Sequence, residues 1–197
     1  MEHYYSEEQT APLNIQEIEI CIGNISIPLY SGSGVFSKKR LDKGTSVLLK
    51  YMKVNNNSKI LDLGCGIGIV GIYVHKMFSN CDVFFSDVNK RAAFLARKNL
   101  KLNKIQGKVF QSDGFQKIKD KFDLILLNPP QVAGKSVCFR LIEESFEHIT
   151  LGGSLQIVAR HNKGGKSLSE KMLSVFGNKE ELGIKSGYRV YSSQKKH

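Results

Sequence analysis

From residue 59 onward, short apolar segments alternate with longer amphipathic ones, and this alternation constrains the fold more than any other feature. The spacing predicts strands at Lys59–Leu63, Asp82–Ser86, Lys108–Gln111, Phe122–Leu127 and Gly153–Val158. It predicts helices at Ile69–Phe78, Lys90–Asn103, Ser136–Ile149 and Ser167–Val175. Such alternation indicates an α/β fold with a doubly wound, mostly parallel sheet and helices on both faces.

Two further strands are predicted near the end of the chain, at Lys179–Ile184 and Tyr188–Ser192. The few residues that join them are too short for a parallel crossover, so they should form an antiparallel pair. The sheet would then have seven strands. Ligands of such sheets bind beyond the carboxyl ends of the parallel strands, and the chemistry is expected there.

The N-terminal segment predicts a β-hairpin. Residues 17–29 alternate apolar and polar side chains around Gly23-Asn24, a typical two-residue turn, and Pro28 indicates an exposed edge. A helix is expected from Thr45 to Met52. We expect one domain over residues 1–197, with the hairpin and a basic glycine-rich loop in residues 1–44 and the α/β core in residues 45–197.

The net charge of +11 is unevenly distributed. Residues 1–37 hold five acidic side chains and no Lys or Arg, so residues 38–197 carry 29 basic against 13 acidic side chains. Such a surplus attracts polyanions, and nucleic acid is the commonest of these partners. A Lys-rich surface that only keeps the protein in solution is the alternative, and charge alone does not separate the two.

Several classes of protein are disfavoured by the sequence. No apolar run approaches the roughly 20 residues that a membrane-spanning helix needs. The N-terminus is acidic and lacks the basic and apolar segments of a secretory signal, so a cytoplasmic location is expected. The four cysteines fit no zinc-ligand spacing, and we expect neither disulfides nor a bound metal.

Glycines directly follow the first strand of the predicted sheet, in the run Asp62-Leu63-Gly64-Cys65-Gly66-Ile67-Gly68-Ile69-Val70-Gly71. They let the backbone turn tightly and approach a ligand, and the helix behind them directs its N-terminal amides at that ligand. Three of these glycines also fit the dinucleotide-binding spacing. They therefore do not distinguish a nicotinamide cofactor from S-adenosylmethionine.

Polar residues end the next two strands. Asp87 lies about 20 residues past the glycines, where a carboxylate can accept hydrogen bonds from both ribose hydroxyls. Ser112-Asp113-Gly114 ends the third strand, where a short polar side chain could bind an adenine amine. Helix capping or turn formation is the alternative role for Asp87 and Asp113.

The motif Asn128-Pro129-Pro130-Gln131 follows the strand expected to face the glycine loop. Two prolines fix φ and remove two backbone donors, which leaves a rigid loop that presents carbonyl oxygens. An exocyclic amine that donates to the Asn128 side-chain oxygen and the Pro129 carbonyl would turn its lone pair toward a methyl donor. This predicts methylation by positioning and preorganised dipoles, with no strong general base. An ordinary loop that ends a strand is the alternative.

The glycine run with Asp62, Asp87 and Asp113 resembles the class I S-adenosylmethionine-dependent methyltransferases, over residues 59 to about 192. The resemblance implies a Rossmann-like methyltransferase domain with S-adenosylmethionine as cofactor, and it places Asp62 near the methionine ammonium. The implied cofactor-binding residues are Asp62, Gly64, Cys65, Gly66, Gly68, Asp87, Val88, Ser112, Asp113, Gly114 and Asn128.

The Asn-Pro-Pro motif resembles that of the amino-methyltransferases, in which Asn128, Pro129 and Pro130 would be catalytic. Their usual fourth residue is an aromatic that stacks on the base, whereas this chain has Gln131, and Phe36 is a candidate replacement or a core residue. Residues 34–49 resemble the ribosomal small-subunit guanine-N2 methyltransferase family, and residues 133–135 and 187–190 resemble its compact single-domain archaeal relatives. By that resemblance the residues that close over the cofactor are Phe36, Ser37 and Thr45.

RNA is the partner that these features predict, ribosomal rather than transfer RNA. The expected substrate contacts are Gln131, Lys38, Lys39, Arg40 and Lys163. A methyltransferase for the glutamine amide of a translation factor and a nicotinamide-dependent oxidoreductase are the alternatives, although the latter gives the Asn-Pro-Pro motif no role. On the helix after the motif, the residues expected to form an exposed face are Arg140, Glu143 and Glu144.

Overall fold

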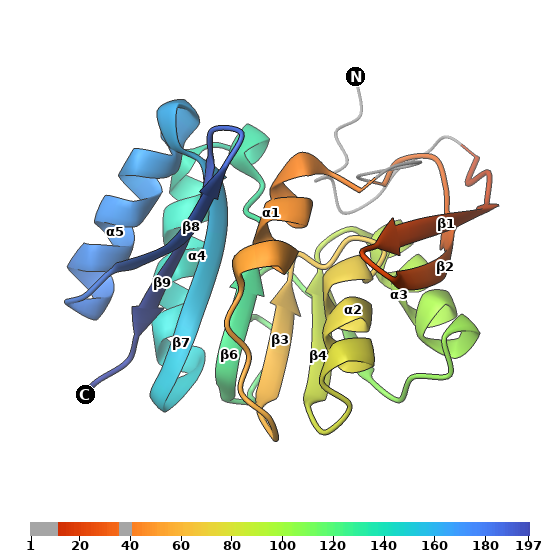
Figure 1. The fold of residues 1–197 in the computed structure, drawn as a ribbon, viewed down its shortest axis with the longest axis horizontal. Coiled ribbons are helices and arrows are strands. Elements are labelled where there is room, and N and C mark those ends of the chain that lie inside the picture. Colours follow the sequence, from red (N-terminus) through yellow and green to blue (C-terminus); the bar gives the residue numbers. More distant parts are fainter. Residues whose placement is uncertain (1–11, 36–40) are drawn as a thin grey trace.

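Seven strands form one twisted sheet in the order β5-β4-β3-β6-β7-β9-β8 (Figure 1). The computed structural model describes residues 12–35 and 41–197. The strands of this sheet are β3 (Lys59–Leu63), β4 (Asp82–Asp87), β5 (Lys108–Gln111), β6 (Phe122–Leu127), β7 (Ile149–Arg160), β8 (Glu180–Lys185) and β9 (Tyr188–Gln194). Neighbours from β5 to β7 are parallel, whereas β9 is antiparallel to β7 and β8. The predicted α/β fold with a terminal antiparallel pair is confirmed.

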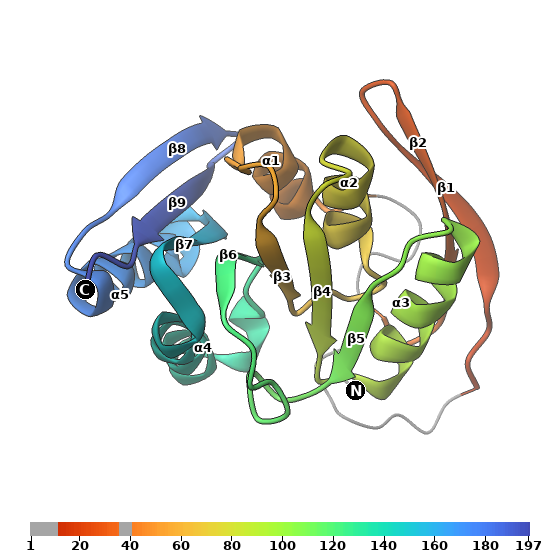
Figure 2. The same cartoon turned by 90° about the horizontal axis from the view of Figure 1, so that it is seen from below.

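Helices cover both faces of this sheet (Figure 2). On one face, a first cluster of buried apolar side chains includes residues of α1 (Lys43–Tyr51), α2 (Ile69–Met77) and α3 (Lys90–Leu102). On the other face, a second cluster includes residues of α4 (Lys135–His148) and α5 (Lys166–Phe176). Residues 124–127 of β6 alternate between the two clusters, as expected for a strand buried on both faces. None of the helices in the described ranges has the length and apolar character to cross a membrane.

Two elements of the α/β core begin more than one residue earlier than the sequence predicts. β7 begins at Ile149 rather than Gly153, because Ile149 pairs with Phe122 across an irregularity in the register. α1 begins at Lys43 rather than Thr45. The reason is that Asp42 caps this helix, its Oδ2 accepting a hydrogen bond from the Thr45 amide at 2.9 Å.

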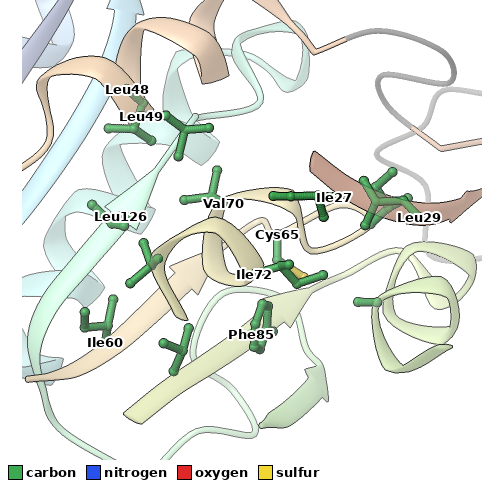
Figure 3. Packing of buried hydrophobic residues seen from close by; sticks show 14 of the residues in the cluster. Ile27, Leu29, Leu48, Leu49, Ile60, Cys65, Val70, Ile72, Phe85 and Leu126 are labelled. Atoms are coloured by element: carbon green, nitrogen blue, oxygen red, sulfur yellow. The ribbon is translucent and has the colours of Figure 1, made fainter. Parts of the chain in front are cut away.

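The predicted hairpin is present as β1 (Gln16–Ile22) and β2 (Ile25–Ser31), which pair antiparallel. Gly23, with φ +57°, takes the left-handed conformation that its two-residue turn needs. Ile27 and Leu29 of β2 are fully buried in the cluster that α2 and α3 share (Figure 3). The hairpin therefore forms part of the core on this side of the sheet.

Asn99 on α3 fastens the hairpin to the glycine loop. Its fully buried side chain accepts a hydrogen bond from the Tyr30 amide at 2.6 Å and donates to the Tyr30 carbonyl at 3.0 Å. The same amide nitrogen donates to the Ile67 carbonyl at 2.8 Å. Tyr30 lies in β2 and Ile67 lies among the glycines, so one buried side chain joins the two segments.

We expect Asn99→Ala to lower the free energy of unfolding by about 1–3 kcal/mol, because the backbone groups of Tyr30 and Ile67 lose buried partners. Urea denaturation followed by circular dichroism measures this change. Lys101→Ala, an exposed residue of the same helix, is the matched control and should shift stability by less than about 0.5 kcal/mol. Equal stability of Asn99→Ala and the control would show that the buried amide does not hold the hairpin.

Candidate active site

A pocket opens at the carboxyl ends of β3, β4, β5 and β6, the edge of the sheet where the sequence predicts chemistry. It holds about 1170 Å³ of empty space, part of which is open to solvent. Ile20, Leu29 and Val35 add apolar surface from the hairpin side. The predicted site residues that line it are Thr45, Asp62, Gly64, Cys65, Gly66, Asp87, Val88, Ser112, Asp113, Gly114, Asn128, Pro129 and Pro130.

The other predicted site residues either do not line this pocket or are not described. Those outside the described part of the chain are Phe36, Ser37, Lys38, Lys39 and Arg40. Gly68 is not part of the pocket wall: with φ +91° it is the N-cap of α2, and a β-carbon there would point at Ala96 and Phe85. Gln131 and Lys163 lie together beyond the wall, where the Gln131 side-chain nitrogen donates to the Lys163 carbonyl at 3.0 Å.

The glycine loop is tied to the end of β4. Gly64 and Gly66 have φ values of +68° and +56°, a conformation that side chains with a β-carbon rarely adopt. The Gly66 amide donates to Asp87 Oδ2 at 2.7 Å, and Asp87 Oδ1 accepts a hydrogen bond from the Asn89 amide at 2.9 Å. Asn89, rather than Asp87, caps α3 with its side chain. Asp87 therefore fixes the loop and faces the pocket.

Asp62 is a buried acid in the pocket wall. Its Oδ2 accepts a hydrogen bond from the Gly71 amide at 2.9 Å. Burial raises the pKa of Asp62 to about 7, and the nearby charge of Asp87 adds to the rise. Burial also raises the pKa of Asp87, to about 6. A ligand that brings positive charge or hydroxyl donors to this wall would favour the ionised form of both carboxyls.

Asp113 is held by Arg140 of α4, which is also paired with Glu144 of the same helix. Arg140 donates to Asp113 at 2.7 Å and to Glu144 at 2.9 Å. The prediction that Arg140 and Glu144 form an exposed face is therefore wrong, and only Glu143 is exposed. The physical reason is that the segment after β5 folds back over α4, where it buries Phe115 in the second cluster.

The Asn-Pro-Pro motif leaves β6 beside the glycine loop, because Leu127 and Leu63 are register partners. The Pro129 carbonyl accepts a hydrogen bond from the Gln131 amide at 2.8 Å. Pro130, with φ −74° and ψ 73°, is the centre of this inverse γ-turn. A carbonyl oxygen has two lone pairs, so Pro129 keeps one for a ligand.

Asp42 is a functional candidate that the sequence reasoning did not single out. The Asn128 side-chain nitrogen donates to Asp42 Oδ2 at 3.0 Å and to Thr45 Oγ1 at 3.1 Å. In the sequence, Asp42 stands out only as an acid three residues before Thr45. That spacing indicates a helix cap and not a contact with the Asn-Pro-Pro motif. The start of α1 thereby becomes part of the site.

A comparison with protein families matches residues 26–192 of this chain to the methyltransferase small domain. The chain belongs to the methyltransferase small domain family. This finding confirms the resemblance drawn from the glycine run and the Asn-Pro-Pro motif, and it disfavours the nicotinamide-dependent oxidoreductase.

Curated relatives extend this family assignment. The methyltransferase is 35% identical to the uncharacterized protein YbxB of Bacillus subtilis (strain 168), with 98% of each chain aligned. It is 37% identical to ribosomal RNA small subunit methyltransferase C of Haemophilus influenzae (strain 86-028NP), over 84% of this chain and 51% of that protein. The chain thus spans about half the length of the ribosomal RNA methyltransferases that it matches.

A solved structure shares the fold. The T. thermophilus 16S rRNA N2 G1207 methyltransferase, in complex with AdoMet and guanosine, superposes with a TM-score of 0.82 at 20% identity. The match covers 95% of this chain and 52% of that one. At this identity the likeness concerns the architecture of the methyltransferase domain.

We expect the stability of the ligand-free methyltransferase to fall as the pH rises from about 4 to about 7, and Asp62→Asn to suppress much of that fall. The pKa of Asp62 is raised from 3.8 to about 7, so the folded protein binds more protons than the unfolded chain within this window. Above it, the ionised buried carboxyl lowers the free energy of unfolding by up to a few kcal/mol. Urea denaturation across this pH range measures both effects.

In Asp62→Asn the amide oxygen still accepts the Gly71 hydrogen bond, and no charge is buried at position 62. The variant should therefore match the wild type near pH 4 and exceed its stability at pH 8. A variant that is less stable than the wild type at pH 8 would contradict the cost assigned to this carboxyl.

Proposed function

We propose that this methyltransferase transfers a methyl group from S-adenosylmethionine to an exocyclic amine of an RNA base, with guanine N2 of ribosomal RNA as the target. One observation carries the proposal: the residues of the Asn-Pro-Pro motif line the same pocket as the glycine loop. Family membership supports the reaction type. The names of the ribosomal RNA methyltransferases among the relatives support the substrate.

The lining of the pocket fits a sulfonium nucleoside. Asp87 has lone pairs left, beyond those used by two backbone amides, with which to accept ribose hydroxyls. Asp62 would balance the methionine ammonium, and Asp113, held by Arg140, would accept the adenine amine. When bound, S-adenosylmethionine supplies an electrophilic methyl group.

The motif residues account for the choice of an amine. An exocyclic amine of guanine is a poor nucleophile, because its lone pair is delocalised into the ring. Asn128 Oδ1 and the Pro129 carbonyl would accept its two hydrogens and favour a pyramidal nitrogen whose lone pair points across the pocket. The proton becomes acidic once the methyl group is attached, so these residues act by positioning and fixed dipoles.

The distribution of charge favours RNA over a protein substrate. Arg160, Lys163 and Lys166 are exposed at the carboxyl end of β7, and the contact with Gln131 brings this segment to the motif. Phosphate contacts of this kind would position RNA without reading its sequence. The glutamine amide of a translation factor would suit the same two acceptors, but it does not need the surplus of basic residues.

We expect Arg140→Ala to weaken the binding of S-adenosylhomocysteine about 3-fold to 30-fold, because Asp113 loses the partner that holds it at the pocket wall. Isothermal titration calorimetry measures this affinity. Glu143→Ala removes an exposed acid from the same helix and should leave the affinity within about 2-fold. Similar affinities for Arg140→Ala and the wild type would argue against a cofactor contact at Asp113.

With labelled S-adenosylmethionine, we expect the methyltransferase to label total RNA rather than total protein. We expect Asn128→Ala to reduce the kcat of RNA labelling on the order of 100-fold, because one of two fixed acceptors is lost. Scintillation counting of the separated fractions measures both. Asn56→Ala is the control, since Asn56 is exposed and lies just before β3, away from the carboxyl ends of the strands; its kcat should equal that of the wild type. Label in protein alone would identify the glutamine-amide alternative, and no label in either fraction would overturn the proposed function.

A further inference from the structure

The carboxamide of Asn128 is held from one side only. Both contacts described for it use the nitrogen, which donates to Asp42 Oδ2 at 3.0 Å and to Thr45 Oγ1 at 3.1 Å. Its oxygen accepts no hydrogen bond from the described part of the chain, and this oxygen is not fully buried. Asn128 and Thr45 both line the pocket. The orientation of this amide decides whether the pocket meets an acceptor or a donor.

The two partners of this amide differ in what they can specify. A threonine hydroxyl can donate or accept, so Thr45 suits either orientation of the carboxamide. A carboxylate can only accept, so Asp42 suits the amide nitrogen and would repel the amide oxygen. The charge of the carboxylate also strengthens the hydrogen bond that it receives.

We propose that Asp42 is the positioning residue that turns the Asn128 oxygen toward the methyl-accepting amine. This inference rests on the proposed function, since an amine presents donors and requires acceptors. In the reversed orientation the Asn128 nitrogen would face the amine as a second donor. One of the two contacts that hold the amine would then be lost.

Asp42 is itself fixed in place by the start of α1. The same Oδ2 accepts a hydrogen bond from the Thr45 amide at 2.9 Å, as the cap of the helix. The space around Gly44 has no room for a side chain. A β-carbon there would lie 3.0 Å from Asp42 Oδ2, 3.2 Å from the Tyr188 ring and 3.3 Å from Asn128 Oδ1. The cap and the close packing leave Asp42 little freedom to move.

Two substitutions separate positioning from helix capping. In Asp42→Ser the hydroxyl is expected to cap α1, because serine is a good cap, but it is too short to reach Asn128. In Asp42→Asn the amide oxygen can both cap the helix and accept from Asn128. A purely structural role predicts that both variants resemble the wild type.

We expect Asp42→Ser to lower kcat about 10-fold or more, with the affinity for S-adenosylhomocysteine within about 2-fold and the melting temperature close to that of the wild type. Asp42→Asn should recover most of the kcat. In the Asn128→Ala background, Asp42→Ser should have no further effect on kcat, because the residue acts through Asn128. Additive losses in the double variant, or an unchanged kcat in Asp42→Ser, would overturn the proposal.

A second measurement does not depend on finding the substrate. In ¹⁵N-labelled protein the side-chain amide signal of Asn128 is identified as the one that Asn128→Ala removes. Its hydrogens should exchange with water several-fold faster in Asp42→Ser than in the wild type, since their charged acceptor is gone. Equal exchange rates would refute the role of Asp42 even if RNA methylation is established. Faster exchange without methylation of any RNA would instead refute the proposed function.

Discussion

The pairing of β3 with β6 is the contact on which the site depends. Because Leu63 lies opposite Leu127 in a parallel register, the glycine loop and the Asn-Pro-Pro motif leave the sheet side by side at the same edge. A slip of one residue would exchange the two faces of β6 and send Leu126 into the wrong cluster. Both strands are packed on both faces, so the two cores fix the register and with it the distance between the two loops.

Two buried carboxyls in the pocket wall lower the stability of the folded chain when they are ionised. Asp62 and Asp87 are buried acids whose pKa values are raised by loss of solvent, and each also fixes a backbone amide of the glycine region. A neutral side chain could make the same backbone contact with less loss of stability. The proposed binding of a positively charged, hydroxyl-bearing cofactor would account for carboxyls at both positions, since folding alone does not call for them.

The central strands could be predicted because strands buried on both faces are short apolar runs between helices of regular period. The pocket lining could be predicted from the topology, which brings the ends of these strands together. The contacts of Asp42 with Asn128 and of Arg140 with Asp113 could not, since they join residues 86 and 27 positions apart. No local pattern encodes such pairs. Asp42 looks like an ordinary helix cap, and Arg140 looks like an ordinary surface residue.

Gln131 shows how a departure from a family motif can be structural. Its side-chain nitrogen donates to the Lys163 carbonyl, and its backbone amide donates to the Pro129 carbonyl and so closes the turn around Pro130. A side chain held in this way braces two loops and is not free to lie flat against a base. The motif is therefore fixed at both ends, by the hydrogen bond from Asn128 to Asp42 and by the contacts of Gln131. Fixed dipoles accelerate a reaction only if they do not reorganise, so in the proposed reaction the contacts of Gln131 would serve the same chemistry as the acceptors of Asn128 and Pro129.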